Sequence, residues 1–124
     1  MVLCSGVLYH MSDPIELIRQ IAKVTQKCFV WTHYFDSTHY PGPRREVRHD
    51  PRYPDVRLHT LEFHPLGMNG DQYWGGNKPV SVWLEREAIL ESFGRAGFSK
   101  IEVTDDQPDH PNGACLSFTA RAAA

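Results

Sequence analysis

The chain begins with a short apolar run that is long enough for one buried strand. Val2 to Val7 carries no charge, and Ser5-Gly6 interrupts the run at a point where glycine lets a chain leave a sheet. Ser12-Asp13-Pro14 follows, with residue types that commonly start a helix. A buried strand, a glycine break and a helix start are typical of a ligand site at the carboxyl end of a strand in an open α/β fold.

A helix is predicted over about residues 14–26, followed by a second strand. Asp13 suits the N-cap, and Glu16 lies three residues further on, as in a capping box. The apolar stripe of this helix consists of Leu17, Ile18, Ile21 and Val24. Cys28 to Tyr34 is rich in aromatic and β-branched residues and is predicted to be a strand buried on both faces. Strand, helix and strand together form a βαβ unit, whose two strands run parallel.

The pattern changes between Phe35 and about Val80, where prolines and glycines punctuate the chain. Within this stretch, Leu58 to Phe63 alternates and predicts an edge or hairpin strand. A long segment without regular structure inside a compact domain is commonly a lid or a binding insertion, and a poorly ordered surface excursion is the alternative. Tyr73-Trp74, followed by two glycines, is the part of this segment that we expect to touch a ligand.

Arginines cluster in the first half of the same segment, at Arg44, Arg45, Arg48, Arg52 and Arg57. Such side chains can hold a phosphate or a carboxylate. Glu46, Asp50 and Asp55 are interleaved with them, however, and mixed charge is typical of solvated surfaces. The sequence therefore favours a salt-bridged surface and leaves an anion site as the alternative.

A second helix and a hairpin are predicted at the end of the chain. The helix spans about residues 85–96, with Gly97 at the position after its C-cap and Phe98 as the apolar contact that often follows. Gly94 inside this helix suggests close packing. Lys100 to Thr104 alternates as a strand, and the alternation returns at Ala114, Leu116, Phe118 and Ala120. Proline and Asn-Gly turn residues between the two strands predict a hairpin, which closes an otherwise parallel sheet with one antiparallel strand.

Length and composition describe an ordinary globular domain. The chain has 124 residues, 41% hydrophobic and 23% charged, with a formal net charge of −2, so it has no general attraction to nucleic acid or acidic lipid. No apolar run approaches the roughly 20 residues of a membrane span, and the N-terminus lacks the basic start of a signal peptide. These features predict a cytoplasmic protein that makes no membrane contact.

Three widely spaced cysteines, Cys4, Cys28 and Cys115, lie within apolar or strand-like runs. They are predicted to be buried free thiols, for which a reducing compartment is natural. Because neither the cysteines nor the histidines show the spacing of a metal site, no metal is expected.

Two motifs carry a resemblance to a known family. Ser-Gly-Val-Leu-Tyr-His-Met-x-Asp-Pro at 5–14 resembles the motif after strand 4 of class I S-adenosylmethionine-dependent methyltransferases. It is most similar to the Gly-Val-Leu-Tyr-His variety in the branch that contains the tRNA wobble-uridine modification enzymes. Trp83-Leu84, with Ala88-Ile89-Leu90 and Ala96-Gly97-Phe98, resembles the run before strand 6. The resemblance covers essentially the whole chain.

This resemblance implies an α/β fold that corresponds to the C-terminal half of a Rossmann-like methyltransferase sheet. Its strands would be 4-5-7-6, the last in the chain antiparallel, with flanking helices and a long insertion. Residues 1–124 would form one partial domain, with 35–80 as an insertion or substrate lid. The glycine-rich turn and the acidic strand end of the family would precede residue 1. Strand 4 would then be an uncovered edge at 2–7, which we expect to pair with a second copy or with a missing N-terminal half.

The resemblance also implies methyl transfer from S-adenosylmethionine. Ser5 and Gly6 are expected beside this cofactor, and Tyr9 is expected to reach its carboxylate-bearing end. His10 is the expected general base. The alternative is that Tyr9 and His10 only cap the following helix, since transfer to a nucleophilic atom needs mainly positioning.

The methyl acceptor is expected to be a small molecule rather than RNA. His33 and Tyr34, at the end of the second strand, and Tyr73 and Trp74, in the insertion, are its expected neighbours. Two other readings stay open: an inactive half-domain that acts as a folding or interaction module, and a small α/β binding protein unrelated to methyl transfer.

Overall fold

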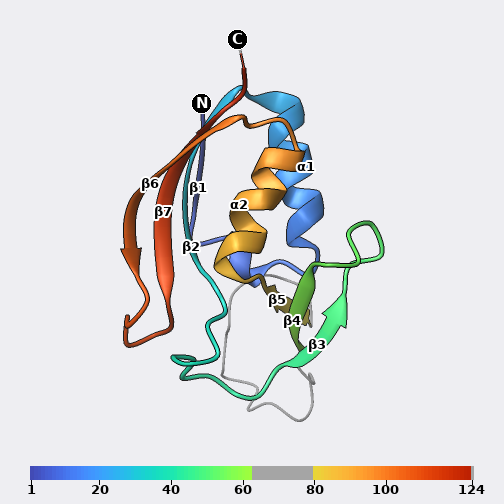
Figure 1. Cartoon of the computed structure of the whole chain (residues 1–124), viewed down its shortest axis with the longest axis vertical. Helices are drawn as coiled ribbons and strands as arrows, with labels where there is room; N and C mark the ends of the chain where they lie inside the picture. Colours follow the sequence, from blue (N-terminus) through green and yellow to red (C-terminus); the bar gives the residue numbers. More distant parts are fainter. Residues whose placement is uncertain (63–79, 124) are drawn as a thin grey trace, which may run out of the picture.

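The computed structural model describes residues 1–62 and 80–123, which form two sheets and two helices (Figure 1). In chain order the elements are β1 (Val2–Ser5), the 3-10 helix η1 (Leu8–His10), α1 (Pro14–Val24), β2 (Lys27–His33), β3 (Glu46–His49), β4 (Arg57–Glu62), β5 (Val80–Trp83), α2 (Arg86–Arg95), β6 (Lys100–Gln107) and β7 (Cys115–Arg121).

The main sheet has the strand order β1-β2-β7-β6. Strands β1 and β2 run parallel, with Cys4 opposite Val30. Strand β7 is antiparallel to both of its neighbours and places Phe118 opposite Val30. The predicted α/β class is therefore confirmed.

Helix α1 begins where the sequence predicts. The Asp13 side chain accepts a hydrogen bond of 3.1 Å from the backbone N–H of Glu16, and Pro14 occupies the first helical position. The helix ends at Val24, two residues before the predicted end. Val24 is 75% exposed and Ile15 is buried, so the apolar stripe is shifted toward the start of the helix.

Helix α2 ends in a Schellman motif. The N–H of Phe98 donates to the carbonyl of Phe93, and that of Gly97 donates to the carbonyl of Gly94, each at 3.1 Å. Gly97 has a φ of +116°, and the rings of Phe93 and Phe98 lie 5.7 Å apart. The predicted helix end is confirmed. The expected close packing at Gly94 is wrong, because a Cβ there would meet nothing within 4 Å.

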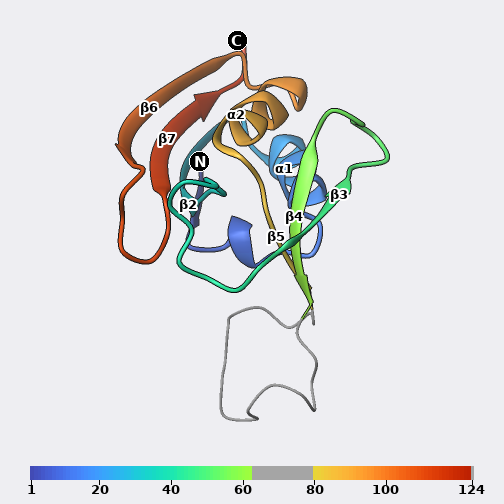
Figure 2. The ribbon, with the colours of Figure 1, turned by 60° about the horizontal axis from the view of Figure 1, so that its bottom comes forward.

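Both helices lie on the same side of the main sheet (Figure 2). Cys28, Val30 and Thr32 on β2 face them and are fully buried. Phe29 and Trp31 point to the other face and are only half-buried. The prediction that this strand is buried on both faces is therefore wrong for the described part of the chain.

A second, antiparallel sheet has the order β3-β4-β5; β3 and β4 lie in the segment expected as an insertion, and β5 extends beyond it. Of its strands only β4 was predicted, as an edge or hairpin strand, and it pairs on both sides: His59 lies opposite Val47 on β3 and Trp83 on β5. Ser81 to Trp83, which directly precedes the predicted second helix, is therefore a strand.

The three cysteines are free and buried, as predicted. Among the residues that the structure places, no helix is long and apolar enough to cross a membrane.

A buried carboxylate fastens the β3–β4 turn to α1. Asp50 is 2% exposed and accepts hydrogen bonds from the Arg52 guanidinium and from the backbone N–H groups of Arg52 and Tyr53. Arg52 in turn contacts Asp13 at the start of α1 at 2.7 Å. The bonds from Arg52 lower the pKa of the Asp50 carboxyl.

This lowered pKa predicts a loss of stability in acid. The Asp50 contribution is fully present above the unfolded pKa, near 3.9, and disappears as the pH falls through the lower folded value. We expect Asp50→Asn to reduce the free energy of unfolding by about 2 kcal/mol at pH 7, and we expect this difference to shrink as the pH falls below about 4. Urea titrations from pH 7 to pH 2 measure this. Asp55→Asn is the control, since the exposed Asp55 has Arg95 as its one ion-pair partner among the described residues. An equal loss in both variants would contradict the assignment.

Candidate functional site

A cavity of about 470 Å³ opens between the carboxyl ends of β1 and β2 and the second sheet. This volume is within the range of small-molecule sites. The residues that line it are Tyr9, His10, His33, Tyr40, Pro41, Gly42, Pro43, Arg45, Leu61, Ser81, Trp83, Pro111 and Asn112. Three predicted site residues, Tyr9, His10 and His33, are thus brought together.

Tyr9 lies at the centre of an aromatic cluster. Gly6, with a φ of +73°, turns the chain out of β1 into η1, and this turn places Tyr9 over the end of β2. Its ring centroid is 4.7 Å from that of His33, 5.8 Å from that of Trp83 and 4.1 Å from that of His10. Burial raises the pKa of the Tyr9 hydroxyl, so this hydroxyl remains a hydrogen-bond donor near neutral pH.

His33 is held in one tautomer. Its Nδ1 lies 2.9 Å from the carbonyl oxygen of Gly113 and 3.2 Å from that of Ala114, so Nδ1 carries the proton and donates it. The ring stacks on Trp83 with a centroid distance of 5.2 Å and an interplanar angle of 9°. Burial lowers the pKa of His33 and outweighs the two backbone hydrogen bonds, which raise it. A neutral His33 therefore presents an unprotonated Nε2, which can accept a proton or a hydrogen bond.

His10 has a similar charge state but a less constrained side chain. Burial is the largest cause that lowers the pKa of His10, and the nearby His33 and Arg45 lower it further. The imidazole of His10 is therefore neutral at pH 7. The described residues give it no hydrogen-bond partner. The two histidines offer neutral nitrogen acceptors on the same cavity, and of the two His33 is the better oriented base.

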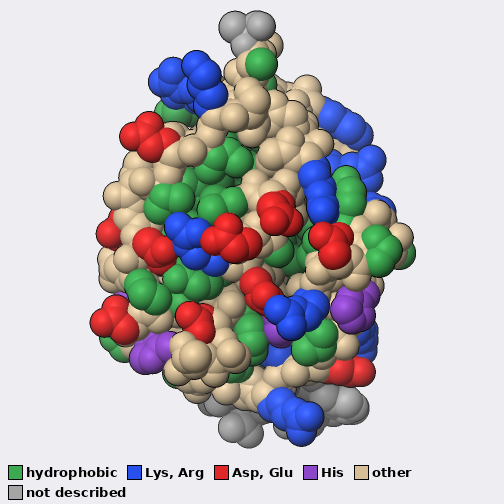
Figure 3. All heavy atoms as spheres, in the orientation of Figure 1, with side chains coloured by type: hydrophobic (Ala, Val, Ile, Leu, Met, Phe, Trp, Pro, Cys, Tyr) green, Lys and Arg blue, Asp and Glu red, His purple; other side chains and the backbone are tan. Residues whose placement is uncertain are grey.

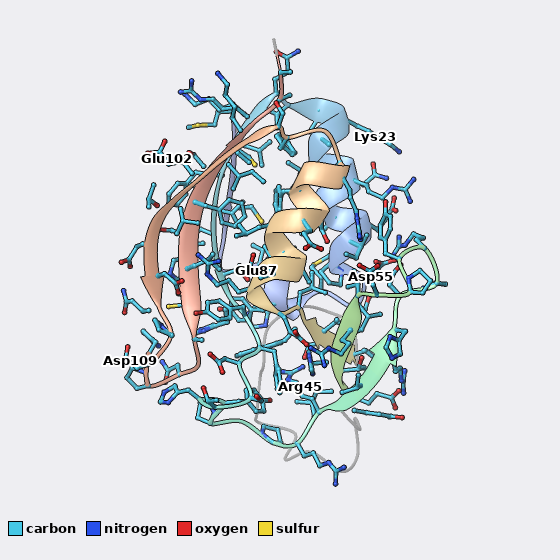
Figure 4. All side chains as sticks on the ribbon, viewed as in Figure 1. Lys23, Arg45, Asp55, Glu87, Glu102 and Asp109 are labelled. Atoms are coloured by element: carbon cyan, nitrogen blue, oxygen red, sulfur yellow. The ribbon has the colours of Figure 1, made fainter. Side chains whose placement is uncertain are left out.

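Arg45, Trp83 and Tyr40 complete the cavity. They belong to the second sheet or to the chain that leads to it, and the sequence patterns did not identify them as site residues. The Arg45 guanidinium lies 4.9 Å from the Trp83 ring and 5.6 Å from the Tyr40 ring, and Arg45 Nε donates to the Tyr40 hydroxyl at 2.8 Å. Figure 4 places Arg45 between the chain that follows β2 and the strands of the second sheet. Only the arginine cluster pointed to this side chain, and that signal favoured the surface.

Gly113, in the β6–β7 turn, supports the Trp83 ring. A Cβ at this position would lie 3.0 Å from Cη2 and 3.1 Å from Cζ3 of Trp83, and the φ of Gly113 is +115°. The position therefore needs glycine for two reasons, a left-handed backbone and close approach to an aromatic ring.

The other predicted site residues lie elsewhere. Ser5 and Gly6 adjoin the cavity at the end of β1 and do not line it; a Cβ at Gly6 would lie 3.9 Å from the Tyr9 hydroxyl. Tyr34 points away from the cavity and donates a hydrogen bond of 2.7 Å to Asp106. Tyr73 and Trp74 lie outside the described residues.

Tyr34 lines a second, smaller hollow of about 370 Å³ together with His59, Glu85 and Arg57. His59 Nε2 donates to Glu85 at 2.8 Å, and its ring stacks 3.7 Å from that of Phe35. His59 Nδ1 is buried, with no hydrogen-bond partner among the described residues. Because charges of both signs surround this hollow, it shows no preference for an anion or a cation.

No protein-family model matches the chain. Among curated proteins it is similar to a tRNA U34 carboxymethyltransferase of Campylobacter lari, with 29% identity over 92 residues, which cover 73% of this chain and 31% of the relative.

Among solved structures it is similar to the N-terminal domain of EvdMO1, crystallised with SAH and D-fucose and with SAH alone. The TM-score is 0.72 in both cases, with 25% identity over 98% of this chain and 46% or 45% of that domain. The chain thus spans less than half the length of the proteins it matches. These similarities support a methyltransferase-type fold.

Proposed function

We propose that the chain is part of an S-adenosylmethionine-dependent methyltransferase and that its aromatic cavity binds the methyl acceptor. The observation that carries this proposal is the convergence of Tyr9, His10 and His33 on one cavity at the carboxyl ends of parallel strands. The similarity to a carboxymethyltransferase and to a domain crystallised with SAH, the demethylated form of the cofactor, supports it.

The cofactor would supply an electrophilic methyl group. The residues at the end of β1 fit such a ligand, because Gly6 exposes backbone in a left-handed turn, Ser5 is exposed and the Tyr9 hydroxyl is 3.9 Å from a Cβ built on Gly6. Ser5 and Gly6 would contact it, and Tyr9 would donate a hydrogen bond to its carboxylate end.

The acceptor, a small molecule rather than RNA, would lie in the cavity that Trp83, Tyr40 and His33 line. One of the two imidazoles, His33 or His10, both neutral at pH 7, would take the proton from the attacking hydroxyl or amine as its bond to the methyl group forms and the methyl–sulfur bond of the cofactor breaks. The aromatic walls would exclude water and orient the acceptor, which is the main requirement of the transfer.

We further propose that strands β1, β2, β7 and β6 correspond to strands 4, 5, 7 and 6 of the methyltransferase sheet, so that the chain is a partial domain. The insertion 35–80 would serve as the acceptor lid, since Tyr40, Arg45 and Leu61 from it line the cavity. Three buried free thiols favour a reducing, cytoplasmic setting.

Calorimetric titration of the chain with SAH tests the proposal. We expect saturable binding, weakened about tenfold by Tyr9→Phe, because the Tyr9 hydroxyl would lose a hydrogen bond to a charged group. Tyr53→Phe is the matched control, since Tyr53 packs against Arg95 away from the cavity. Absence of binding at millimolar SAH would mean that the chain alone is no methyltransferase.

The outer edge of β1 favours a second candidate, an interaction module that pairs with another chain. Strand β1 ends the main sheet among the described strands, and Leu3 on it is 68% exposed. We expect sedimentation at micromolar concentration to show a dimer that Leu3→Lys dissociates. A well-folded monomer alone would rule out this candidate.

A further inference from the structure

The described lining of the cavity carries one positive charge and no carboxylate. Arg45 is half-buried there, and none of the described residues that line the cavity is Asp or Glu. His10 and His33 are neutral at pH 7, since burial lowers their pKa values. The net charge of the described lining is therefore positive, although that of the whole chain is −2.

Among the described residues, the groups that bind Arg45 are all neutral. Its Nη1 donates to the carbonyl oxygen and the hydroxyl of Ser81, both at 3.1 Å, and to the carbonyl of His59 at 3.3 Å. Its Nε is bound to the Tyr40 hydroxyl. Within the described part of the chain no bond occupies Nη2, so this side of the guanidinium fork is available to a ligand.

Most of the other described arginines behave differently. Carboxylates pair with Arg19, Arg48, Arg52, Arg57, Arg86 and Arg95, and in Figure 3 acidic and basic side chains are interspersed on the visible face. The salt-bridged surface predicted for the arginine cluster thus fits Arg48, Arg52 and Arg57. It does not fit Arg45, a partly desolvated cation whose described partners are all uncharged, and such a cation favours binding of an anion.

The walls beside Arg45 are flat. Trp83 is 8% exposed and lies 5.3 Å from the Tyr40 ring, centroid to centroid, and 4.9 Å from the guanidinium. Aromatic side chains next to a fixed guanidinium suit a ring that carries an oxyanion, because the ring packs against the aromatic side chains while the free Nη2 donates to an oxygen of the anion.

We propose that the acceptor is a ring-bearing acid, whose carboxylate or phosphate pairs with Arg45. This inference rests on the proposed function, which leaves the acceptor open. It assigns Arg45 as the residue that selects acidic over neutral acceptors, and it adds a contact that the sequence-based site did not contain.

Binding of matched probes to the full chain tests the inference. 4-Hydroxybenzoate is compared with the neutral 4-hydroxybenzamide, and phenyl phosphate with phenol, by calorimetry at pH 7.5. We expect at least one acid to bind about tenfold or more tightly than its neutral partner, as expected for a charged hydrogen-bonded pair. The acid that shows the larger ratio identifies the oxyanion as a carboxylate or a phosphate.

Arg45→Gln should reduce that ratio to about one, whereas Arg44→Gln, which removes the same charge from the exposed neighbour, should leave it unchanged. If Arg45→Gln fails to fold, the comparison of acids with neutral partners in the unmodified chain still shows whether the cavity selects acidic ligands. Equal binding of the acids and their neutral partners would overturn the inference. So would the absence of binding of every probe at about 10 mM, a concentration at which even weak ligands bind. Because SAH binding is measured separately, that result would leave the proposed function standing.

Discussion

Replacing Phe118 by alanine is expected to lower the free energy of unfolding by about 3–5 kcal/mol. Phe118 lies on β7, inside the main sheet, and is 0% exposed. Its ring meets that of Phe93 on α2 edge to face, with centroids 5.1 Å apart, and Val30 on β2 lies opposite it. Because a strand and a helix hold the site from both sides, the cavity left by the ring cannot collapse without moving one of them.

Urea unfolding followed by circular dichroism measures this loss, which is a large fraction of the stability of an ordinary domain. Phe29→Ala is the matched control, since it removes the same ring from the half-buried face of the same sheet; we expect it to cost about 1 kcal/mol. Equal losses in the two variants would mean that the helices do not form the core with this sheet.

Local sequence signals predicted most of the main sheet and both helices. Asp13 and Pro14 set the start of α1, and Gly97 with Phe98 set the end of α2, because each of these residues acts on its own backbone. Burial was harder to predict. Phe29 and Trp31 look like residues of a strand covered on both faces, but the position of both helices on one side is a tertiary feature that local patterns do not contain.

The second sheet escaped prediction because its strands are short and its pairings are long-range. Strand β3, Glu46–His49, is exposed throughout and has no apolar alternation. Strand β5, Val80–Trp83, looks like the approach to a helix, and its partner β4 lies some twenty residues earlier in the chain. The residue pattern within β4 or β5 therefore does not indicate that these two strands pair.

The candidate site was predictable where it follows from topology. Tyr9 and His10 follow β1, His33 is the last residue of β2, and the carboxyl ends of such neighbouring parallel strands meet. Arg45 and Trp83 lie at the same cavity because the second sheet positions them. Since the sequence patterns did not predict that sheet, they could not place these two residues at the site. Tyr34 adjoins His33 in the chain but points to the other side, since successive side chains of an extended chain alternate.

Gly113→Ala is expected to damage both the fold and the cavity. A left-handed φ of +115° costs an L-residue about 1–2 kcal/mol. The new methyl group would also lie 3.0 Å from the buried Trp83 ring, and such overpacking adds about 1–3 kcal/mol. Because Trp83 stacks on His33 and lies against Arg45, its displacement should weaken binding of the acidic probe about tenfold as well.

Two other glycines separate these causes. Gly97 has nearly the same φ, +116°, but open space around it, so Gly97→Ala carries the backbone strain alone. Gly94 lies in α2 with open space and no left-handed φ, and Gly94→Ala should stabilise the chain by about 0.5–1 kcal/mol. The difference between Gly113→Ala and Gly97→Ala in urea unfolding therefore measures how firmly the Trp83 wall is fixed. If the two variants lose equal stability and both retain the probe affinity, Trp83 can move freely, and the cavity is not the rigid acceptor site on which the selection of a ring-bearing acid depends.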